Sequence, residues 1–461
     1  MVAKDADKVD LRSFTPANEV YDRGRALAES VPTSAHDHEP AHPHRPSVLA
    51  YIDKSNEGRL EHLLPLRIGR MIASPFAFFR GAAGLMAADL ADSPANGVNA
   101  QLCGDAHAAN FGLYGSPAGE IIMDINDFDE TIPGPWEWDV KRLAASLVLA
   151  GREGGVPSKG CIDAAEDAVK SYRRTIRDLA DAPFLKSWTA LPDASVLDAA
   201  KADELIDDFA RAATKARTNT SDKVVAKWTT QLDDHETGVR RHRFIDDPPI
   251  LTHIEPAEVE AITDGLESYV DTLRETRKNL ITRFAVRDVA FRIVGTGSVG
   301  LRSYVALLHG NRGESLVLQL KEARASALSP YLPAATVKHE GKRIVQGARL
   351  VQSGPDILFG WTTIGERPYM VRQFRNMKGD IDPTVLERNH LDDYGRLAGA
   401  LLARAHTRSL DPRLLAGYFD GDKDVHKSIG RFAVRYADQT ISDHAELVEA
   451  VDSGRMQAQL A

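Results

Sequence analysis

The chain has 461 residues, of which 43% are hydrophobic and 27% charged, and its formal net charge is −9. This composition is typical of a soluble globular protein, and the length predicts two or three packed units. The acidic balance argues against nucleic acid or an anionic membrane as a partner, because both repel negative charge. With two cysteines and a charged N-terminus that lacks an apolar stretch, we expect a cytoplasmic protein.

Residues 1–60 come first in chain order and mix Pro, Ala, His and charged residues. This composition predicts a flexible N-terminal arm. Its histidines stand among prolines in HDHEPAHPHRP, and because proline interrupts a helix, one helix face does not present them together. A solvated segment is therefore favoured over a metal site.

Residues 61–283 are predicted to form a mainly helical lobe. Apolar residues recur at helical spacing in AAEDAVKSYRRTIRDLA and ADELIDDFARAATKA, which predicts a helical insert over 163–280. From 284 to 376 the period shortens to that of strands, as in SLVLQLK and RPYMVRQF, and predicts a small antiparallel sheet lobe. YGRLAGALLARAH then resumes the helical pattern, so C-terminal helices over 377–461 are expected to complete the helical lobe. The predicted fold class is α+β, with two lobes.

The densest chemistry of the chain lies in one loop and the strand after it. In LCGDAHAANFG, Asp105 precedes Asn110 by five positions, and GEIIMDINDFDE ends in a cluster of carboxylates that includes Asp124 and Asp127. Phosphoryl transfer uses such side chains, because an attacking hydroxyl must be oriented and magnesium held through carboxylate and amide oxygens. The same residue types favour turns, so a turn-rich loop without chemistry is the alternative.

A glycine-rich segment follows far downstream, in AFRIVGTGSVGLRSYVALL. It holds Gly295, Gly297, Ser298 and Gly300, and the next strand-like run ends at Lys321. In a dinucleotide-binding fold this motif opens a helix, whereas an extended run follows it here. Strand, glycine loop, strand and lysine match the phosphate-covering hairpin of kinases better. A dinucleotide-dependent oxidoreductase is the weaker alternative.

The segment ATVKHEGKRIVQGARLVQ, which follows that lysine, is predicted to be a helix carrying Glu340. In protein kinases a helix glutamate pairs with the phosphate-binding lysine. Glu340 is therefore a candidate partner of Lys321, and a solvated helix residue is the equally open alternative.

Several of these segments resemble known families. LCGDAHAANFG, IIMDINDFDE and GPWEWDVKRLA resemble the aminoglycoside and choline phosphotransferase branch of the protein-kinase-like superfamily. Together with SPFAFFRGAA, VGTGSVGLRSY and LARAHTRS, they are similar to a bacterial domain of unknown function, family 2252, from about residue 64 to about residue 449. The resemblance implies a kinase-like fold, while the reaction must be argued from the site because one fold hosts many functions.

The resemblance also implies roles for individual residues. Asp105 would be the catalytic base or hydroxyl-orienting residue, and Asn110 a magnesium ligand. The second metal ligand stays open, because Asp124 ends the apolar strand, whereas Asp127 begins an Asp-Phe-Asp that imitates the kinase Asp-Phe-Gly. Asp139 matches an acidic residue that braces the catalytic loop.

Two departures from that pattern stand out. Cys103 occupies a position where these phosphotransferases usually carry histidine, and the glycine loop and Lys321 follow the catalytic loop, whereas an ordinary kinase has them first. The order predicts a circularly permuted kinase-like fold. We expect an ATP- and magnesium-dependent phosphotransferase acting on a hydroxyl of a small-molecule acceptor. The alternatives are a pseudokinase-like nucleotide-binding or interaction module, and a nucleotidyl (AMP) transferase on the same fold.

Overall fold

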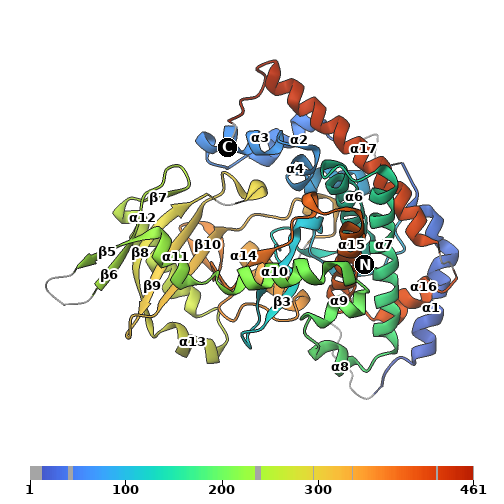
Figure 1. Cartoon of the computed structure of the whole chain (residues 1–461), viewed down its shortest axis with the longest axis horizontal. Coiled ribbons are helices and arrows are strands. Elements are labelled where there is room, and N and C mark those ends of the chain that lie inside the picture. The colour runs from blue at the N-terminus through green and yellow to red at the C-terminus, as the bar shows by residue number, and fades with distance from the viewer. Residues whose placement is uncertain are drawn as a thin grey trace.

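The structure is a computed structural model that describes residues 13–39, 45–233, 240–293, 295–334, 336–421 and 424–459. In these residues the fold is α+β, and every strand pair is antiparallel. Figure 1 shows the largest sheet at one end of the molecule and most of the long helices at the other. The α+β class expected from the sequence is confirmed.

The N-terminal segment forms helices that pack on the rest of the molecule. They are α1 (Ala17–Ser30), η1 (Thr33–His36), α2 (Val48–Asn56), η2 (Glu61–Leu63), α3 (Leu64–Met71), α4 (Pro75–Arg80) and α5 (Ala83–Leu90).

For the described part of residues 1–60, the prediction of a flexible arm is therefore wrong. Helix α1 packs against α16 (Pro412–Tyr418), where Gly24 approaches the backbone of Leu414. His36 is buried, with its Nε2 atom 2.9 Å from the Tyr418 hydroxyl. Of the residues that suggested an arm, His36 ends η1, His38 follows it, and Pro46 comes two residues before α2. Pro40 and Pro43 lie outside the described residues. His42 and His44 lie outside the described residues.

The loop with the candidate catalytic residues connects two small sheets, one of two strands and one of three. Its elements are β1 (Asn99–Leu102), η3 (Ala108–Asn110), β2 (Phe111–Gly115), β3 (Ile121–Ile125) and β4 (Ile132–Pro135). Strand β1 pairs with β4, while β2 lies between β3 and β13 (Gly379–Asp380). The loop between β1 and β2 is thereby held at both ends by a sheet.

Long helices form the core behind this loop. They are α6 (Trp136–Glu153), α7 (Ser158–Asp181), α15 (Arg388–His406) and α17 (Val425–Asp452). Helices α7 and α15 pack so closely that a Cβ atom on Gly399 would lie 2.1 Å from the carbonyl oxygen of Ala168. The largest apolar cluster of the described residues joins these helices to the loop strands.

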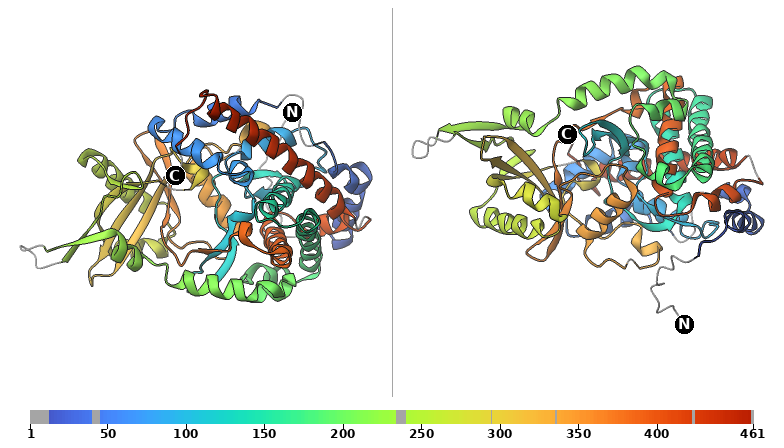
Figure 2. Two further views of the ribbon diagram at one scale, coloured as in Figure 1. Left: turned by 45° about the horizontal axis from the view of Figure 1, so that its top comes forward. Right: turned by 90° about the horizontal axis from the view of Figure 1, so that it is seen from below.

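The predicted helical insert over 163–280 also contains strands. After α8 (Phe184–Thr189), α9 (Ser195–Ala200), η4 (Asp203–Leu205), α10 (Ile206–Arg217) and α11 (Ser221–Trp228) come β5 (Thr229–Asp233), β6 (Arg240–Phe244) and β7 (Leu251–His253), and then α12 (Pro256–Val270) and α13 (Glu275–Ile281). Figure 2 shows the chain through α10 running from the long helices to the sheet. The short strands lie in a polar stretch without a clear two-residue period, which explains why the sequence pattern did not reveal them.

The largest sheet has six strands in the order β11-β12-β10-β9-β8-β7. Its remaining strands are β8 (Phe284–Arg292), β9 (Ser303–Gly310), β10 (Ser315–Glu322), β11 (Gly360–Ile364) and β12 (Arg367–Gln373), and helix α14 (Glu340–Val351) lies between β10 and β11 along the chain. The sheet thus begins with β7, before the predicted boundary at residue 284. The short helices η5 (Thr296–Ser298), η6 (Ser329–Tyr331) and η7 (Pro383–Val385) lie in connecting loops.

The two faces of this sheet have different neighbours. Because side chains alternate along a strand, Leu318 and Leu320 of β10 share the apolar cluster of α12, while Val317 packs with α11 on the other face. Lys321 follows the alternation of Val317. The sheet therefore turns this lysine away from α12.

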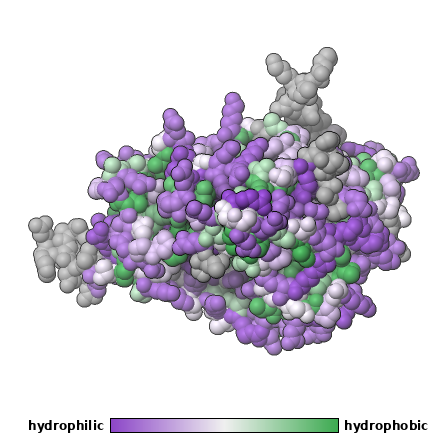
Figure 3. Space-filling model, turned by 90° about the horizontal axis from the view of Figure 1, so that it is seen from above, coloured by the Kyte–Doolittle hydropathy of each residue, from purple (hydrophilic) through white to green (hydrophobic). Residues whose placement is uncertain are grey.

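No helix in the described ranges is long and apolar enough to cross a membrane. On the face of the molecule that Figure 3 shows, hydrophilic side chains dominate and the hydrophobic ones are scattered among them.

Candidate functional site

A cleft of about 340 Å³ lies among the loop after β1, the six-stranded sheet and helices α2 to α5. It is lined by seven of the ten residues that the sequence marked as site residues, and these come from segments far apart in the chain. The seven are Asp105, Asn110, Asp127, Gly295, Gly297, Ser298 and Lys321.

The loop with Asp105 is held from below by Asp139 of α6. The Asp139 carboxylate accepts hydrogen bonds from the backbone N–H groups of Cys103 and Gly104, at 2.8 and 3.1 Å. Gly104 has a φ of +81°, and a Cβ atom there would lie 2.2 Å from the carbonyl oxygen of Glu130. This position therefore requires glycine, and Asp139 braces the loop as the resemblance implied.

An imidazole from another part of the chain also supports this brace. The Nε2 atom of His406, on α15, lies 3.3 Å from the Asp139 carboxylate, and its Nδ1 atom lies 2.9 Å from the Tyr172 hydroxyl. His406 belongs to the segment LARAHTRS. Sequence reasoning did not assign it a role, because nothing in the local pattern says which loop it meets.

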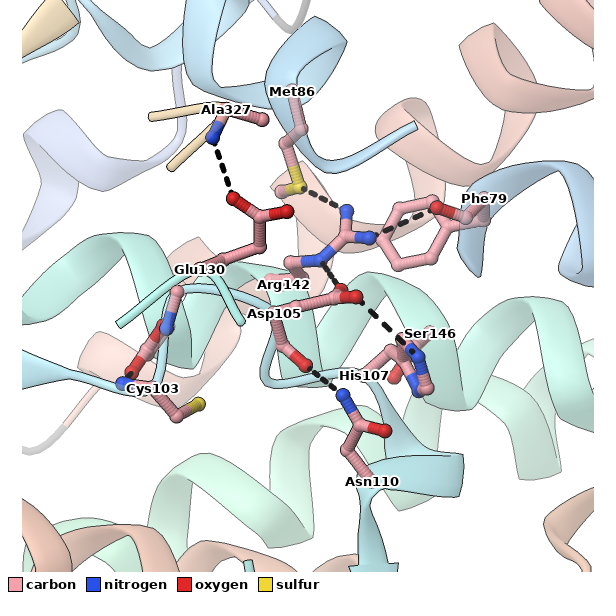
Figure 4. A network of polar contacts seen from close by, with 12 residues as sticks. Phe79, Met86, Cys103, Asp105, His107, Asn110, Glu130, Arg142, Ser146 and Ala327 are labelled. Carbon is pink, nitrogen blue, oxygen red and sulfur yellow. Dashed lines mark hydrogen bonds and ion pairs between the residues drawn. The ribbon is translucent and has the colours of Figure 1, made fainter. Parts of the chain in front are cut away.

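Asp105 is oriented by Arg142, which sequence reasoning also missed. The Nε atom of Arg142 donates to Oδ1 of Asp105 at 2.5 Å. The guanidinium of Arg142 donates a further hydrogen bond to the Phe79 carbonyl oxygen at 2.9 Å and stacks over the Phe79 ring (Figure 4). Arg142 lies three residues after Asp139, on the same side of α6, so helical spacing was the available signal.

Burial raises the pKa of Asp105, and Arg142 opposes the rise. The ring of His107 lies beside it, with Nε2 3.6 Å from Oδ2 of Asp105. Burial and then Arg80 and Arg142 hold the pKa of His107 well below its ordinary value, so the imidazole is neutral near pH 7. The cleft therefore contains a carboxylate with one oxygen fixed by a cation and the other near a neutral ring.

Asn110 and Asp127 present oxygen atoms suited to a hard cation. The side-chain nitrogen of Asn110 donates to the backbone oxygen of Asp105 at 2.7 Å, which leaves its side-chain oxygen as an acceptor. Burial opposes ionisation of Asp127, but Lys321, Arg372 and Lys378 outweigh it and lower its pKa. Asp127 is therefore anionic at neutral pH.

Lys321 makes its ion pairs with the Asp-Phe-Asp segment. Its Nζ atom lies 3.8 Å from a carboxylate oxygen of Asp127 and closer to one of Asp129. Burial opposes the charged form of Lys321, but these two carboxylates raise its pKa. Burial and the neighbouring Asp127 raise the pKa of Asp129. The sequence placed Asp129 in the carboxylate cluster and in the Asp-Phe-Asp segment but gave it no role of its own.

Asp124 was one of two candidates for the metal aspartate, and the structure places it outside the cleft lining. Its side chain is 2% exposed, and its oxygens accept hydrogen bonds from the backbone N–H groups of Ile125 and Ser353, both at 2.9 Å. Asp124 lies within β3, whereas Asp127 lies beyond its end. Of the two aspartates expected to bind metal, only Asp127 lines the cleft.

Glu340 and Gly300 also lie outside the lining. Glu340, the first residue of α14, forms an ion pair with Arg343 one turn later at 2.5 Å, so the expected pair with Lys321 is not made. Arg343 is nearer to Glu340 in the helix, and Asp129 takes the place at Lys321. Gly300 has a φ of +86° and faces the Arg59 side chain. Gly300 therefore shapes the glycine loop without lining the cleft.

The cleft differs in charge from the whole chain. Its lining within the described residues has seven lysines and arginines against five carboxylates. The cations are Lys54, Arg59, Arg67, Arg80, Lys321, Arg324 and Arg372, and the acids are Asp105, Asp127, Asp129, Glu130 and Glu322. A net positive pocket in a protein of charge −9 suits an anionic ligand.

The described residues contain no group of three or more His, Cys, Asp or Glu side chains arranged to hold a metal ion. Magnesium at phosphate sites commonly uses only one or two carboxylates, with water and substrate phosphates completing its shell. Asn110 and Asp127 fit that kind of site and do not fit a metal cage built by protein alone.

Comparison with known proteins finds one family. A model described as "Uncharacterized protein conserved in bacteria (DUF2252)" matches residues 59–450, which include both the Asp105 loop and the sheet with Lys321. No curated protein and no solved structure matches this chain.

Proposed function

We propose that this chain, which belongs to the bacterial DUF2252 family, is an ATP- and magnesium-dependent phosphotransferase that acts on a hydroxyl of a small molecule. The family description names no reaction, so the proposal rests on the site. The observation that carries it is the meeting of two distant segments in one cleft. Lys321 pairs with Asp129, which lies 192 residues earlier in the chain, and it lines the same cleft as the Asp105 loop and the glycine loop.

The proposed reaction transfers the γ-phosphoryl group of ATP. The oxygen of the acceptor hydroxyl forms a bond to the γ-phosphorus, and the bond from that phosphorus to the β–γ bridging oxygen breaks, its electron pair leaving with ADP. Asp105 accepts the hydroxyl proton, a role that its raised pKa favours. Arg142 holds Asp105 in place, and Lys321 and the glycine loop position the phosphates.

Asn110 and Asp127 are the residues that would hold magnesium. A bound magnesium ion supplies positive charge that offsets the charge developing on the phosphate oxygens. Lys321 keeps Asp127 ionised, which is the state a metal ligand needs.

A kinase-like arrangement with circularly permuted lobes is part of the proposal. Strand β8, the glycine loop, β9, the lysine at the end of β10 and then α14 follow one another as the corresponding parts do in protein kinases. The Asp105 loop precedes them in this chain. Permutation is compatible with catalysis, because the site needs only that both parts face one cleft.

The first test replaces Asp105 by Asn, which keeps an oxygen for Arg142. Wild-type protein is expected to bind ATP in the presence of magnesium and to release ADP with suitable acceptors from a panel of small hydroxyl compounds. Asp105→Asn is expected to lower the rate of ADP release about a hundredfold or more while ATP affinity stays within about threefold. Calorimetry and chromatography of the nucleotides measure both quantities. Retained turnover in the variant would sink the assignment.

The two alternatives give other results in the same assay. AMP in place of ADP indicates nucleotidyl transfer. ATP binding without either product across the panel indicates a pseudokinase-like module, a reading favoured by the Glu340–Arg343 pair, which leaves Lys321 without its usual helix partner. Absence of magnesium-dependent ATP binding would contradict the proposal and both alternatives.

A further inference from the structure

Three arginines gather at the part of the cleft formed by the end of α2. Arg59 donates from Nε to the backbone oxygen of Ser55 at 2.9 Å, and Arg324 donates from Nη1 to the same oxygen at 3.3 Å. Arg67 donates from Nη1 to the side-chain oxygen of Asn56 at 2.7 Å. All three line the cleft, although they come from a loop, from α3 and from the loop after β10.

These arginines lack ion-pair partners. Within the described ranges, none of the three is within 4.0 Å of a carboxylate oxygen, and the Nε atom of Arg67 is buried without a hydrogen-bond partner. Arg67 is only 1% exposed. Burial and the charges of the other two arginines lower the pKa of Arg59 to about 9, and burial and Arg324 lower the pKa of Arg67 to about 10.

The surroundings do not balance this charge. Glu130 is a carboxylate whose charge acts on Arg59 in the direction that raises its pKa. However, this carboxylate already accepts a hydrogen bond from the Ala327 N–H at 2.5 Å, and burial raises the pKa of Glu130. The carbonyl end of α2 offers about half a negative charge. Buried like charges without partners are costly, so the cluster is explained best by an anion that completes it.

We propose that Arg59, Arg67 and Arg324 form a subsite for a phosphate group of a substrate. The planar guanidinium donates two parallel hydrogen bonds to phosphate oxygens, which makes arginine well suited to this ligand. The phosphate is either part of the polyphosphate of a nucleotide or a phosphate carried by the acceptor. The inference goes beyond the proposed phosphoryl transfer, because that proposal gives no role to these three arginines.

The test measures binding of inorganic phosphate and of pyrophosphate by calorimetry, without turnover. Wild-type protein is expected to bind at least one of the two, and Arg67→Met and Arg324→Met are expected to weaken that binding about tenfold or more. Arg312 is an exposed residue in the turn between β9 and β10 and does not line the cleft. Arg312→Met is therefore expected to leave phosphate and pyrophosphate binding unchanged. Arg59 is left intact, because it also donates to the Val299 carbonyl oxygen in the glycine loop at 2.5 Å.

Two further measurements sharpen the result. Arg67→Lys keeps the positive charge but loses the two parallel hydrogen bonds of the guanidinium. Its affinity for phosphate is therefore expected to lie between those of the wild type and Arg67→Met. It also replaces Arg67→Met in the test if that variant fails to fold. Competition between phosphate and ATP assigns the subsite to the nucleotide, whereas simultaneous binding assigns it to the acceptor. No phosphate or pyrophosphate binding by the wild type, or equal binding by Arg67→Met, Arg324→Met and Arg312→Met, would overturn the proposal. Either failure leaves the Asp105 assay untouched.

Discussion

The acidic side chains around the loop differ in what holds each of them. Asp139 binds backbone N–H groups below the loop, Asp124 binds backbone N–H groups beside β3, and Asp105 and Asp127 meet cations in the cleft. A carboxylate already paired with backbone donors is stabilised where it lies and is a poor metal ligand. Among these four, Asp105 and Asp127 are therefore the candidates for the proposed chemistry.

This division predicts different outcomes for two neighbouring variants. Asp127→Asn is expected to weaken magnesium-dependent binding of an ATP analogue about tenfold or more, because a metal ligand loses its charge. Asp124→Asn is the matched control: its amide oxygen keeps the Ser353 N–H and gives up the Ile125 N–H, and because Asp124 does not line the cleft, the affinity is expected to stay within about twofold. Titration of the analogue at several magnesium concentrations measures both. The reverse order of effects would return the metal site to Asp124.

Some site residues could be predicted from the sequence because a short motif places them. Asp105, Asn110 and Lys321 lie at fixed distances from strands and glycines, and local chain geometry sets where they point. The partners Arg142 and His406 were missed, because packing between elements decides which side chain meets Asp105 or Asp139. Glu340 shows the converse. Its position in the motif predicted a pair with Lys321, but in the structure Asp129 pairs with Lys321 and Glu340 pairs with Arg343.

At the scale of elements, the contact between α7 and α15 combines close packing with crowded charge. Arg388 pairs with Asp163 at 2.7 Å, and Arg396 pairs with Asp167 at 2.5 Å. Asp392 lies between them with its Oδ1 atom buried and without a hydrogen-bond partner. Burial, then Asp167 and Asp163, raise its pKa to about 6.

This contact predicts a stability that depends on pH. The folded protein holds the proton of Asp392 up to about pH 6, while the unfolded chain releases it near the ordinary value of 3.8. Ionised Asp392 therefore costs stability, and the cost grows as the pH rises from about 4 to about 6. Asp392→Asn is expected to stabilise the fold at pH 7.5 by about 1 kcal/mol, after allowance for solvent screening, and by less at pH 5.

Thermal unfolding of the wild type and the variant at the two pH values measures the gain. Asp178→Asn is the control, because this exposed acid of α7 is not among the charges that raise the pKa of Asp392, and it is expected to give no gain at pH 7.5. An equal gain of Asp392→Asn at both pH values would show that the titration of this group is not the cause.

The elements that could be predicted are those with a sustained period. The strands of the sheet from β8 to β12 and helices such as α10 and α15 carry clear periods of two or of 3.6 residues. Strands β5 to β7 and helix α1 were missed because they are short or mostly polar, and their pairing or packing partners lie elsewhere in the chain. Length and tertiary contact, rather than local preference, decide these elements.

At the scale of the whole molecule, the two ends of the described chain meet and support the cleft. Helix α1 packs on α16, and Gly69 of α3 approaches the backbone of Gln459. The segment after α2 donates from the Leu60 N–H to the Gly300 carbonyl oxygen at 2.8 Å. The N-terminal segment therefore connects the C-terminal helices to the glycine loop.

Arg45 is the side chain through which this connection can be tested. It lies 2.9 Å from carboxylate oxygens of both Asp89, on α5, and Asp443, on α17, and both partners are almost fully buried. Removing Arg45 takes away a cation that pairs with two buried carboxylates, so Arg45→Met is expected to lower the free energy of unfolding by about 3 kcal/mol. Exposed Arg25, which pairs with Asp22 and Asp420, is the matched control, and Arg25→Met is expected to cost less than about 1 kcal/mol. Urea denaturation compares the two. A cost for Arg45→Met as small as that for Arg25→Met would mean that the N-terminal segment does not hold the ends of the chain together, because only a connected segment makes this arginine costly to lose.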